Sequence, residues 1–204
     1  MSKLFRLLVI SFSTSFLFAN TFAASEFLQY AKTLSATGVI NAQNFEVGYR
    51  LTDKLSRAES AKLVVNAMKI PSGECSGTVY ADVSAALGNL CGYIETANSN
   101  GLIASASYFR PNDPVTRAEF AKFVANAAKL TLTSTATGFS DVSESNTLSG
   151  YINALAEAGI INITTHFRPN DSITRGEAFK MLVGAIEYTM IPVRESIVSG
   201  EMGN

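Results

Sequence analysis

The chain has 204 residues, of which 47% are hydrophobic, and its 16 basic and 17 acidic side chains give a formal net charge of −1. This balance argues against a general nucleic-acid-binding protein, which needs a basic surface. The length and the apolar content suit one compact globular unit.

The first residues have the features of a secretory signal peptide. Lys3 and Arg6 give a positive start, a short apolar run follows over residues 7–19, and small residues precede a cleavage point after Ala23. We therefore expect residues 1–23 to be removed on export. The alternative is an uncleaved membrane anchor, although the apolar run is short for a bilayer-spanning helix.

The mature chain is expected to be mildly acidic and to contain no membrane span. Without Lys3 and Arg6 it has 14 basic and 17 acidic residues, a net charge of −3. No stretch after the cleavage point is long and apolar enough to cross a bilayer.

One sequence pattern occurs three times. Residues 109–123 read FRPNDPVTRAEFAKF, residues 167–181 read FRPNDSITRGEAFKM, and residues 49–63 hold a more divergent copy, YRLTDKLSRAESAKL. A period of about 60 residues indicates a repeat architecture. We expect a first repeat at 24–70, a second at 71–130, a third at 131–190 and a C-terminal tail at 191–204.

Each copy contains a signal for the start of a helix. Ser or Thr, followed three residues later by Glu and ahead of an apolar run, is a capping box, in which each side chain bonds the other residue's backbone N–H. The capping pairs are Ser56–Glu59, Thr116–Glu119 and Thr174–Glu177. They predict helices near residues 56–69, 116–129 and 174–188.

A second helix is expected upstream in each repeat, near residues 30–40, 93–103 and 151–161. Gly38, Gly101 and Gly159 suit the left-handed residue that closes a helix. No stretch alternates strongly enough to predict a sheet. The sequence thus predicts an all-α fold in which three helix-loop-helix repeats pack together, because one such pair cannot bury its own apolar face.

Two cysteines, Cys75 and Cys91, lie around the start of the second repeat. We expect them to form a disulfide in an exported protein, and the alternative is a pair of buried free thiols. A zinc site is poorly supported, since the only histidine, His166, lies far along the chain.

Three arginines, Arg57, Arg117 and Arg175, occupy the first position of the capped helices, where the helix dipole makes a cation mildly unfavourable. One explanation is an ion pair with the aspartate four residues earlier, which is Asp53, Asp113 or Asp171. The other is an anion site, where free backbone N–H groups and the guanidinium converge on a carboxylate or phosphate. Both can hold, with the aspartate orienting the arginine.

The second and third copies resemble the S-layer homology domain. The resemblance rests on Phe-Arg-Pro-Asn-Asp-x-(Val/Ile)-Thr-Arg-(Ala/Gly)-Glu, preceded by Gly-(Leu/Ile)-Ile and by Tyr-Ala-Asp-Val at 80–83 or Phe-Ser-Asp-Val at 139–142. It extends over about residues 27–190. It implies a pseudo-threefold spindle around a central three-helix bundle, with grooves between the arms.

The resemblance also implies a function, which is non-covalent anchoring to a cell-wall polysaccharide. In many relatives the ligand is a secondary wall polymer with pyruvate ketals, and the arginine of Thr-Arg-Ala-Glu contacts it. That role falls here on Arg57, Arg117 and Arg175, with Arg57 expected to be weaker or silent because the first copy lacks the Pro and Asn of the turn.

The first copy also departs from the family pattern in its loop. It lacks the Phe-x-Asp-Val opening, and Gly38 lies 19 positions before Arg57, whereas Gly101 lies 16 positions before Arg117. The loops before Phe109 and Phe167 have lost the usual glycines, which leaves the ligand open.

We expect no catalysis, no cofactor and no metal, because the repeated Asp and Glu serve turns and caps and no phosphate loop or metal spacing occurs. The expected partner is a cell-wall polysaccharide, and the expected location is the cell surface, cell wall or S-layer, or the periplasmic face where an outer membrane exists. The alternative function is a self-assembling or S-layer-associated envelope protein that acts through contacts with itself or with another protein.

Overall fold

The computed structural model describes residues 26–43, 46–134 and 138–201, so the predicted signal peptide lies outside the described residues. Every regular element in these ranges is a helix, and the extended contacts are three isolated bridges. The predicted all-α class is therefore confirmed for the described residues.

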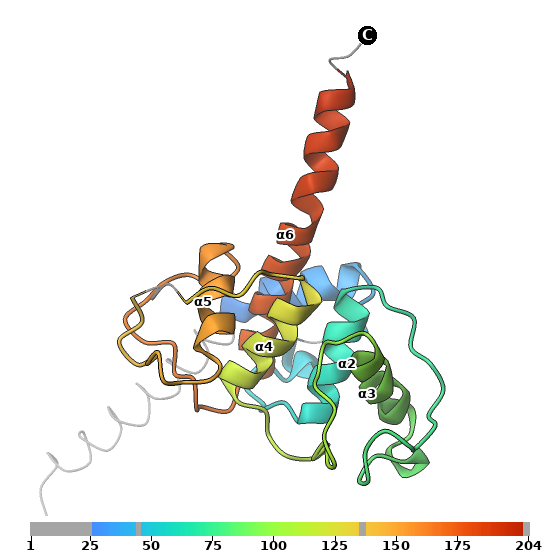
Figure 1. Ribbon diagram of the computed structural model, residues 1–204. Helices are drawn as coiled ribbons and strands as arrows, with labels where there is room; N and C mark the ends of the chain where they lie inside the picture. The colour runs from blue at the N-terminus through green and yellow to red at the C-terminus, as the bar shows by residue number, and fades with distance from the viewer. Residues whose placement is uncertain (1–25, 44–45, 135–137, 202–204) are drawn as a thin grey trace, which may run out of the picture.

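Two sets of helices carry the fold (Figure 1). The capped helices are α2 (Arg57–Ala67), α4 (Arg117–Ala127) and α6 (Arg175–Glu201). The upstream helices are residues 26–36, α3 (Asn89–Ser99) and α5 (Ser149–Glu157). Two short 3₁₀ helices are η1 (Glu46–Tyr49) and η2 (Ala85–Leu87).

The local signals read from the sequence give the helix ends. Complete capping boxes open α2 and α4, and Thr174 and Glu177 make the same reciprocal bonds at α6. The upstream helices begin and end a few residues before the predicted ranges, and Gly38, Gly101 and Gly159 follow them with φ of 73°, 71° and 69°. The predicted glycine stops are confirmed.

Helix α6 is much longer than expected, since it was predicted to end near residue 188 and runs to Glu201, into the predicted tail. The helices α2 and α4 stop where Lys69 and Lys129 each adopt a left-handed φ of 54°. The corresponding residue of the third repeat is Glu187, which stays helical. Figure 1 shows α6 projecting far beyond the rest of the body.

The three capped helices pack against one another. A ring of backbone hydrogen bonds joins the extended segments that lead into these helices. The N–H of Val115 donates to the C=O of Leu55, Ile173 donates to Val115, and Leu55 donates to Ile173, at 3.0, 3.1 and 3.2 Å. All three side chains are almost fully buried. The ring explains why this position is Leu, Val or Ile in every copy. The predicted spindle outline, with its arms and grooves, stays a prediction.

Each capped helix packs with the upstream helix of the next repeat. Helix α2 packs on α3, and α4 packs on α5. The lysine of each capped helix lies over the tyrosine of that neighbour, in the pairs Lys62–Tyr93 at 5.2 Å, Lys122–Tyr151 at 5.4 Å and Lys180–Tyr30 at 5.9 Å from ammonium to ring centroid. A repeat therefore completes its neighbour rather than itself.

Residues 26–36 close this cycle by packing on α6, the last helix. A Cβ at Gly176 would lie 2.7 Å from the ring of Phe27, so only glycine fits the contact without a shift. Glu26 also forms a 2.9 Å ion pair with Lys180.

The predicted disulfide is confirmed, with Cys75 and Cys91 joined at an S–S distance of 1.99 Å. It ties the linker after α2 to the first turn of α3. Nearby, a Cβ at Gly92 would lie only 2.2 Å from the carbonyl oxygen of Gly73, so glycine lets the linker pass directly over the helix. The Glu95 carboxylate accepts from the N–H groups of Ser76 and Gly77 and holds the linker turn.

Candidate functional site

The three repeated arginines lie across the boundaries between repeats. Each guanidinium Nε donates to a backbone carbonyl of the following repeat in the cycle: Arg57 to Phe109 at 2.8 Å, Arg117 to Phe167 at 2.7 Å and Arg175 to Tyr49 at 3.1 Å. Their side chains are only 14%, 14% and 19% exposed. The arginines are therefore part of the packing between repeats.

Their ion-pair partners are the capping glutamates of the next repeat. The Nη1–Oε1 distances are 2.7 Å for Arg57–Glu119, 2.9 Å for Arg117–Glu177 and 3.9 Å for Arg175–Glu59. The pairing considered from the sequence, with the aspartate four residues earlier, is wrong. Asp53, Asp113 and Asp171 instead pair with Arg50, Arg110 and Arg168, at 2.6, 3.7 and 3.6 Å.

The first-turn N–H groups of the capped helices are already bonded, which corrects one part of the predicted anion site. Arg57 N–H donates to the Asp113 carbonyl, Ala58 N–H to the Pro111 carbonyl and Glu59 N–H to the Ser56 hydroxyl. The other two capped helices repeat these bonds with the next repeat in the cycle. An anion must therefore be held by side chains rather than by the helix N–H groups.

A second set of arginines, Arg50, Arg110 and Arg168, lies beside the site and is not among the site residues predicted from the sequence. They have positive φ of 52°, 61° and 60°, which is a strained conformation for a residue with a side chain. Their side chains are 62%, 58% and 52% exposed. The signal available in the sequence was that this arginine recurs in every copy beside the aromatic residue.

In repeats two and three an upstream aspartate braces the strained turn. Asp82 accepts from the N–H groups of Phe109 and Arg110 at 2.8 and 2.7 Å, and Asp141 accepts equivalently from Phe167 and Arg168. Desolvation raises the pKa of both carboxyls, but these backbone bonds outweigh it and hold each pKa below its ordinary value. These aspartates belong to the Tyr-Ala-Asp-Val and Phe-Ser-Asp-Val segments, which gives those segments a structural role.

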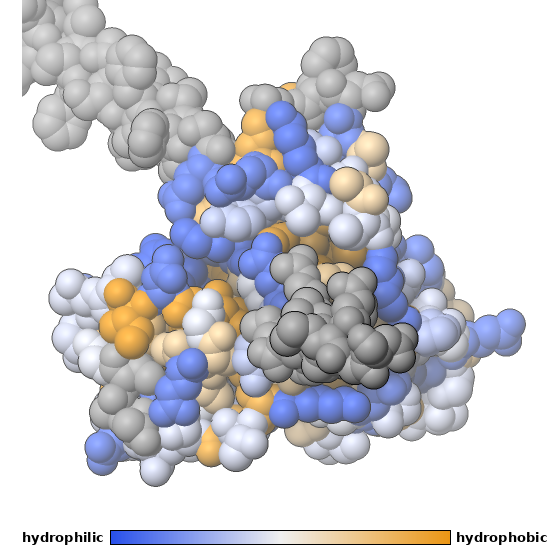
Figure 2. All heavy atoms as spheres, turned by 90° about the horizontal axis from the view of Figure 1, so that it is seen from above, coloured by the Kyte–Doolittle hydropathy of each residue, from blue (hydrophilic) through white to orange (hydrophobic). Residues whose placement is uncertain are grey.

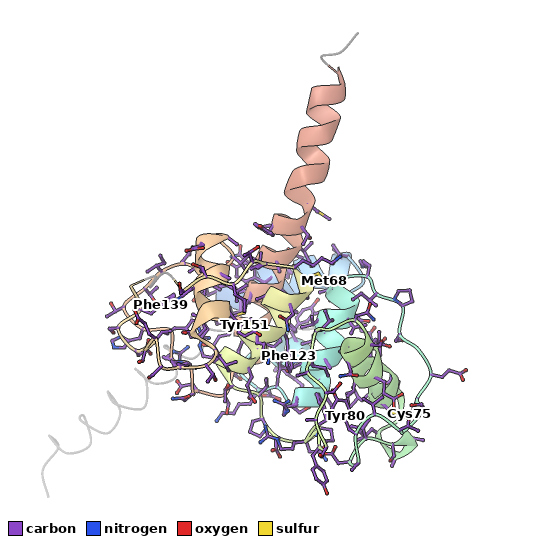
Figure 3. All side chains as sticks on the ribbon, viewed as in Figure 1. Met68, Cys75, Tyr80, Phe123, Phe139 and Tyr151 are labelled. Atoms are coloured by element: carbon purple, nitrogen blue, oxygen red, sulfur yellow. A yellow bond between two sulfur atoms is a disulfide. The ribbon has the colours of Figure 1, made fainter. Side chains whose placement is uncertain are left out.

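Aromatic rings complete the boundary. The Arg57 and Arg117 guanidinium carbons lie 5.0 and 4.9 Å from the ring centroids of Phe109 and Phe167. Tyr80 packs on Phe109 at 5.4 Å and Phe139 packs on Phe167 at 5.6 Å. Tyr80 and Phe139 lie far apart in Figure 3, and the same aromatic contact is therefore built at two separate places.

Burial shapes the electrostatics of the arginines. Burial lowers the pKa of Arg117, and the Glu177 carboxylate opposes this shift. Burial also lowers the pKa of Arg175, where the opposing carboxylate is that of Glu59. Burial raises the pKa of Glu177, but the Thr174 N–H and the charges of Arg117 and Arg168 outweigh it and leave that pKa below its ordinary value. The Arg117–Glu177 pair stays ionised at neutral pH, because arginine remains protonated far above that range.

Among the described residues, Arg175 and Arg117 each line a cavity that opens to solvent. The Arg175 groove has a volume of about 630 Å³ and is lined by Arg175, Glu59, Lys62, Asn66 and Tyr93, together with the loop of the first repeat. The Arg117 groove has a volume of about 230 Å³ and is lined by Arg117, Glu177, Lys180, Phe27 and Ile160 among others. Both are open at the surface and mix charged with apolar walls.

The described residues bring together no cluster of metal ligands. Across residues 26–43, 46–134 and 138–201, no three His, Cys, Asp or Glu side chains gather in a way that could hold a metal ion. His166 is exposed in the loop before Phe167. Among the helices described, none has both the length and the apolar character to span a bilayer.

Comparison with known families identifies two segments of the chain. Residues 79–121 and 138–179 match the S-layer homology domain, in the second and third repeats. Such domains are in general non-catalytic modules that anchor proteins to cell-wall polymers and S-layers, which implies association with the cell envelope. No curated protein matches the chain.

Proposed function

We propose that the chain is an exported envelope-anchoring module that binds an anionic cell-wall polysaccharide through grooves lined by Arg57, Arg117 and Arg175. The observation that carries the proposal is the position of these arginines: each is held between two repeats, and Arg117 and Arg175 line surface cavities. The two matched segments support the class of ligand.

The chemistry of the site suits an anion that carries hydroxyl groups. A guanidinium fixed by its Nε still has other N–H donors for two parallel bonds to a carboxylate or phosphate. Asp53, Asp113 and Asp171 contribute through the turn rather than by touching the ligand, because their carbonyls bond the arginine N–H groups and their carboxylates pair with the exposed arginines.

A pull-down on cell walls purified from the source organism tests this function. The chain without its first 23 residues should sediment with intact walls and should be released by high salt, since the contact is charge-assisted. Walls stripped of their secondary polymer should retain little of it. Equal sedimentation with stripped walls would overturn the polysaccharide as ligand.

A second candidate function, self-association, is favoured by the end of the body where α6 emerges. A cavity of about 610 Å³ there is lined by Met68, Ile70, Leu102, Ile186 and Met190. Tyr188 and Met190 are 36% and 49% exposed. Figure 2, which looks down on this end, shows hydrophobic residues gathered in patches among hydrophilic ones.

Sedimentation velocity separates this candidate from a monomeric anchor. If α6 mediates assembly, the wild-type chain should form oligomers at micromolar concentration, and a Tyr188→Ser, Met190→Ser double variant should be monomeric. A monomeric wild-type chain across that range would remove the candidate and leave the wall-binding proposal untouched.

A further inference from the structure

Resting on the proposed function, we propose that the Arg175 groove is the main binding groove of the three and that Arg175 and Lys62 together hold an anionic group of the wall polymer there. The three arginines are equivalent in sequence, but their surroundings differ. Three independent features of the structure distinguish the Arg175 groove: the strength of the ion pair, the balance of nearby charge and the size of the cavity.

The first feature is that Arg175 is the least committed of the three arginines. Its Nη1 lies 3.9 Å from Glu59, whereas the equivalent distances are 2.7 Å to Glu119 and 2.9 Å to Glu177. An incoming anion competes with the internal carboxylate for Nη1 of the guanidinium. The cost of this competition is lowest where the internal contact is longest.

The glutamates explain part of this difference. Glu177 is also contacted by Arg168, and Glu119 lies 3.7 Å from Arg110, so each of these carboxylates bridges two arginines. In the first repeat Arg50 pairs with Asp53 at 2.6 Å instead.

The second feature is the charge balance of the three equivalent sets of side chains. Around Arg175 there are three cations and two anions, around Arg57 three and three, and around Arg117 three and four. The first set is Arg175, Arg50, Lys62, Glu59 and Asp53; the second is Arg57, Arg110, Lys122, Glu119, Asp113 and Asp82; the third is Arg117, Arg168, Lys180, Glu177, Asp171, Asp141 and Glu26. Only the Arg175 set therefore carries a net positive charge.

Lys62 supplies the uncompensated charge. Its ammonium lies 5.2 Å from the centroid of the Tyr93 ring, and both residues line the Arg175 groove. Within the part of the chain that the structure describes, no carboxylate lies within ion-pair distance of Lys62. The counterpart in the Arg117 groove, Lys180, is paired with Glu26 at 2.9 Å.

The third feature is space. The Arg175 groove, at about 630 Å³, falls within the range of roughly 300–1,000 Å³ that is usual for ligand pockets, and the Arg117 groove, at about 230 Å³, does not. The longer loop of the first repeat forms the extra wall and places the amides of Asn41 and Gln43 on it. The ring of Phe27 lines the smaller groove. Amide groups beside two cations suit sugar hydroxyls next to an anionic group.

Calorimetric titration of soluble polymer fragments, released from purified cell walls, tests the inference on the chain without its first 23 residues. Arg175→Ala should weaken binding by about ten- to a hundredfold, and Arg175→Lys should recover little of it, because a point charge lacks the planar fork. Lys62→Ala should weaken binding about fivefold. Lys122→Ala, which removes the equivalent lysine over Tyr151, is the matched control and should bind as the wild type does.

Glu59→Gln provides a test in the opposite direction. Glutamine still accepts the Ser56 N–H in a capping box, but it no longer competes for Arg175 with a charge. This variant should therefore bind the fragments several-fold more tightly.

Chemical treatment of the fragments identifies the anion. Amidation with carbodiimide and glycinamide neutralises carboxylates, and hydrofluoric acid cleaves phosphodiesters, so one of the two treatments should abolish binding and thereby name the anion. Binding that survives both treatments would overturn an anion as the group held by Arg175 and Lys62.

The outcomes also separate this inference from the proposed function. If the wild type binds but Arg57→Ala or Arg117→Ala loses as much affinity as Arg175→Ala, the preference for one groove is wrong and anchoring stands. If the wild type does not bind untreated fragments, both fail. Melting curves accompany every variant. If Arg175→Ala is unfolded, an unchanged affinity in both Lys62→Ala and Glu59→Gln overturns the inference.

Discussion

The first repeat and the two later ones solve the same boundary in different ways. At the Arg57 and Arg117 boundaries, the arginine is held by a short ion pair, the capping glutamate bridges to a second arginine, and Asp82 or Asp141 braces the turn. The turn of the first repeat has neither a bridged glutamate nor an equivalent upstream aspartate within the described residues. Its longer loop leaves a wider cavity and an uncompensated lysine.

This difference teaches that sequence divergence in one copy can relieve a constraint as well as lose a function. The second and third copies match the family pattern, and the structure shows that much of that pattern maintains contacts between repeats. The first copy lacks several of these contacts. Arg175, which packs against this copy, is therefore less neutralised by a carboxylate. The four predictions below test how far the two kinds of boundary differ.

The largest effect is expected for the glutamate that bridges two arginines. Glu177→Gln keeps the cap but leaves Arg117, which is 14% exposed, without its counter-charge. The free energy of unfolding should fall by about 3 kcal/mol, as for a broken buried ion pair. Glu59→Gln, the matched change at the looser boundary, should cost under about 1 kcal/mol. Urea denaturation measures both, and equal losses would mean that the boundaries are alike.

The disulfide should rank next. The Cys75→Ser, Cys91→Ser double variant should lower the free energy of unfolding by about 3 kcal/mol, the value expected for a loop of this length. The same variant should bind wall fragments normally once folded, because the bridge lies in the linker and not in either groove. Denaturation of the double variant, beside reduced and oxidised wild type, measures this effect. A loss below about 1 kcal/mol would show that the Glu95 contacts alone hold the linker.

Closure of the ring is tested by Gly176. Gly176→Ala places a methyl group 2.7 Å from the Phe27 ring and should destabilise the protein by about 1–3 kcal/mol through overpacking. The other two repeats have Ala58 and Ala118 here, both buried without such a clash. Combining Gly176→Ala with Phe27→Ala should give less than the sum of the two single losses. Strict additivity in that double-mutant cycle would contradict the contact.

Acid should weaken the later repeats through the bracing aspartates, with a smaller effect. The folded-state pKa of Asp82 and of Asp141 lies below the ordinary value, so their contribution is fully present above the unfolded pKa of about 3.9 and is lost as the pH falls through the folded one. The melting temperature should therefore fall between about pH 5 and pH 3. Asp82→Asn with Asp141→Asn should flatten this part of the profile. An unaltered slope in the double variant would assign the acid sensitivity to other carboxylates.

Local features of this fold were predictable from sequence, and contacts between repeats were not. Thr116 and Glu119 predict their own helix start, and Gly101 predicts a helix end, because each signal acts within a few residues. The partner of Arg57 lies 62 residues away, so a search limited to its neighbours proposed Asp53 instead. The same limit assigned Arg57 to the first repeat, although its guanidinium lies against Phe109 and Glu119 of the second.

The length of α6 was also not predictable from the sequence. Proline removes a backbone N–H and commonly ends a helix, so Pro192 predicts a stop near the start of the tail, yet α6 runs through it to Glu201. The sequence alone does not show that Lys69 and Lys129 adopt the left-handed conformation that ends α2 and α4. It therefore does not predict that the equivalent residue, Glu187, stays helical.

The pairing of residues 26–36 with α6 has a consequence for how the polypeptide acquires its structure. Glu26 meets Lys180 across a separation of 154 residues, so the helix of residues 26–36 can complete its packing only after α6 has been synthesised. Until then its contacts with α6, through Phe27 and Tyr30, are missing. Since such distant contacts slow folding and prolong exposure of apolar surface, nascent molecules interrupted before the third repeat should be substrates for chaperones and proteases rather than shorter folded proteins.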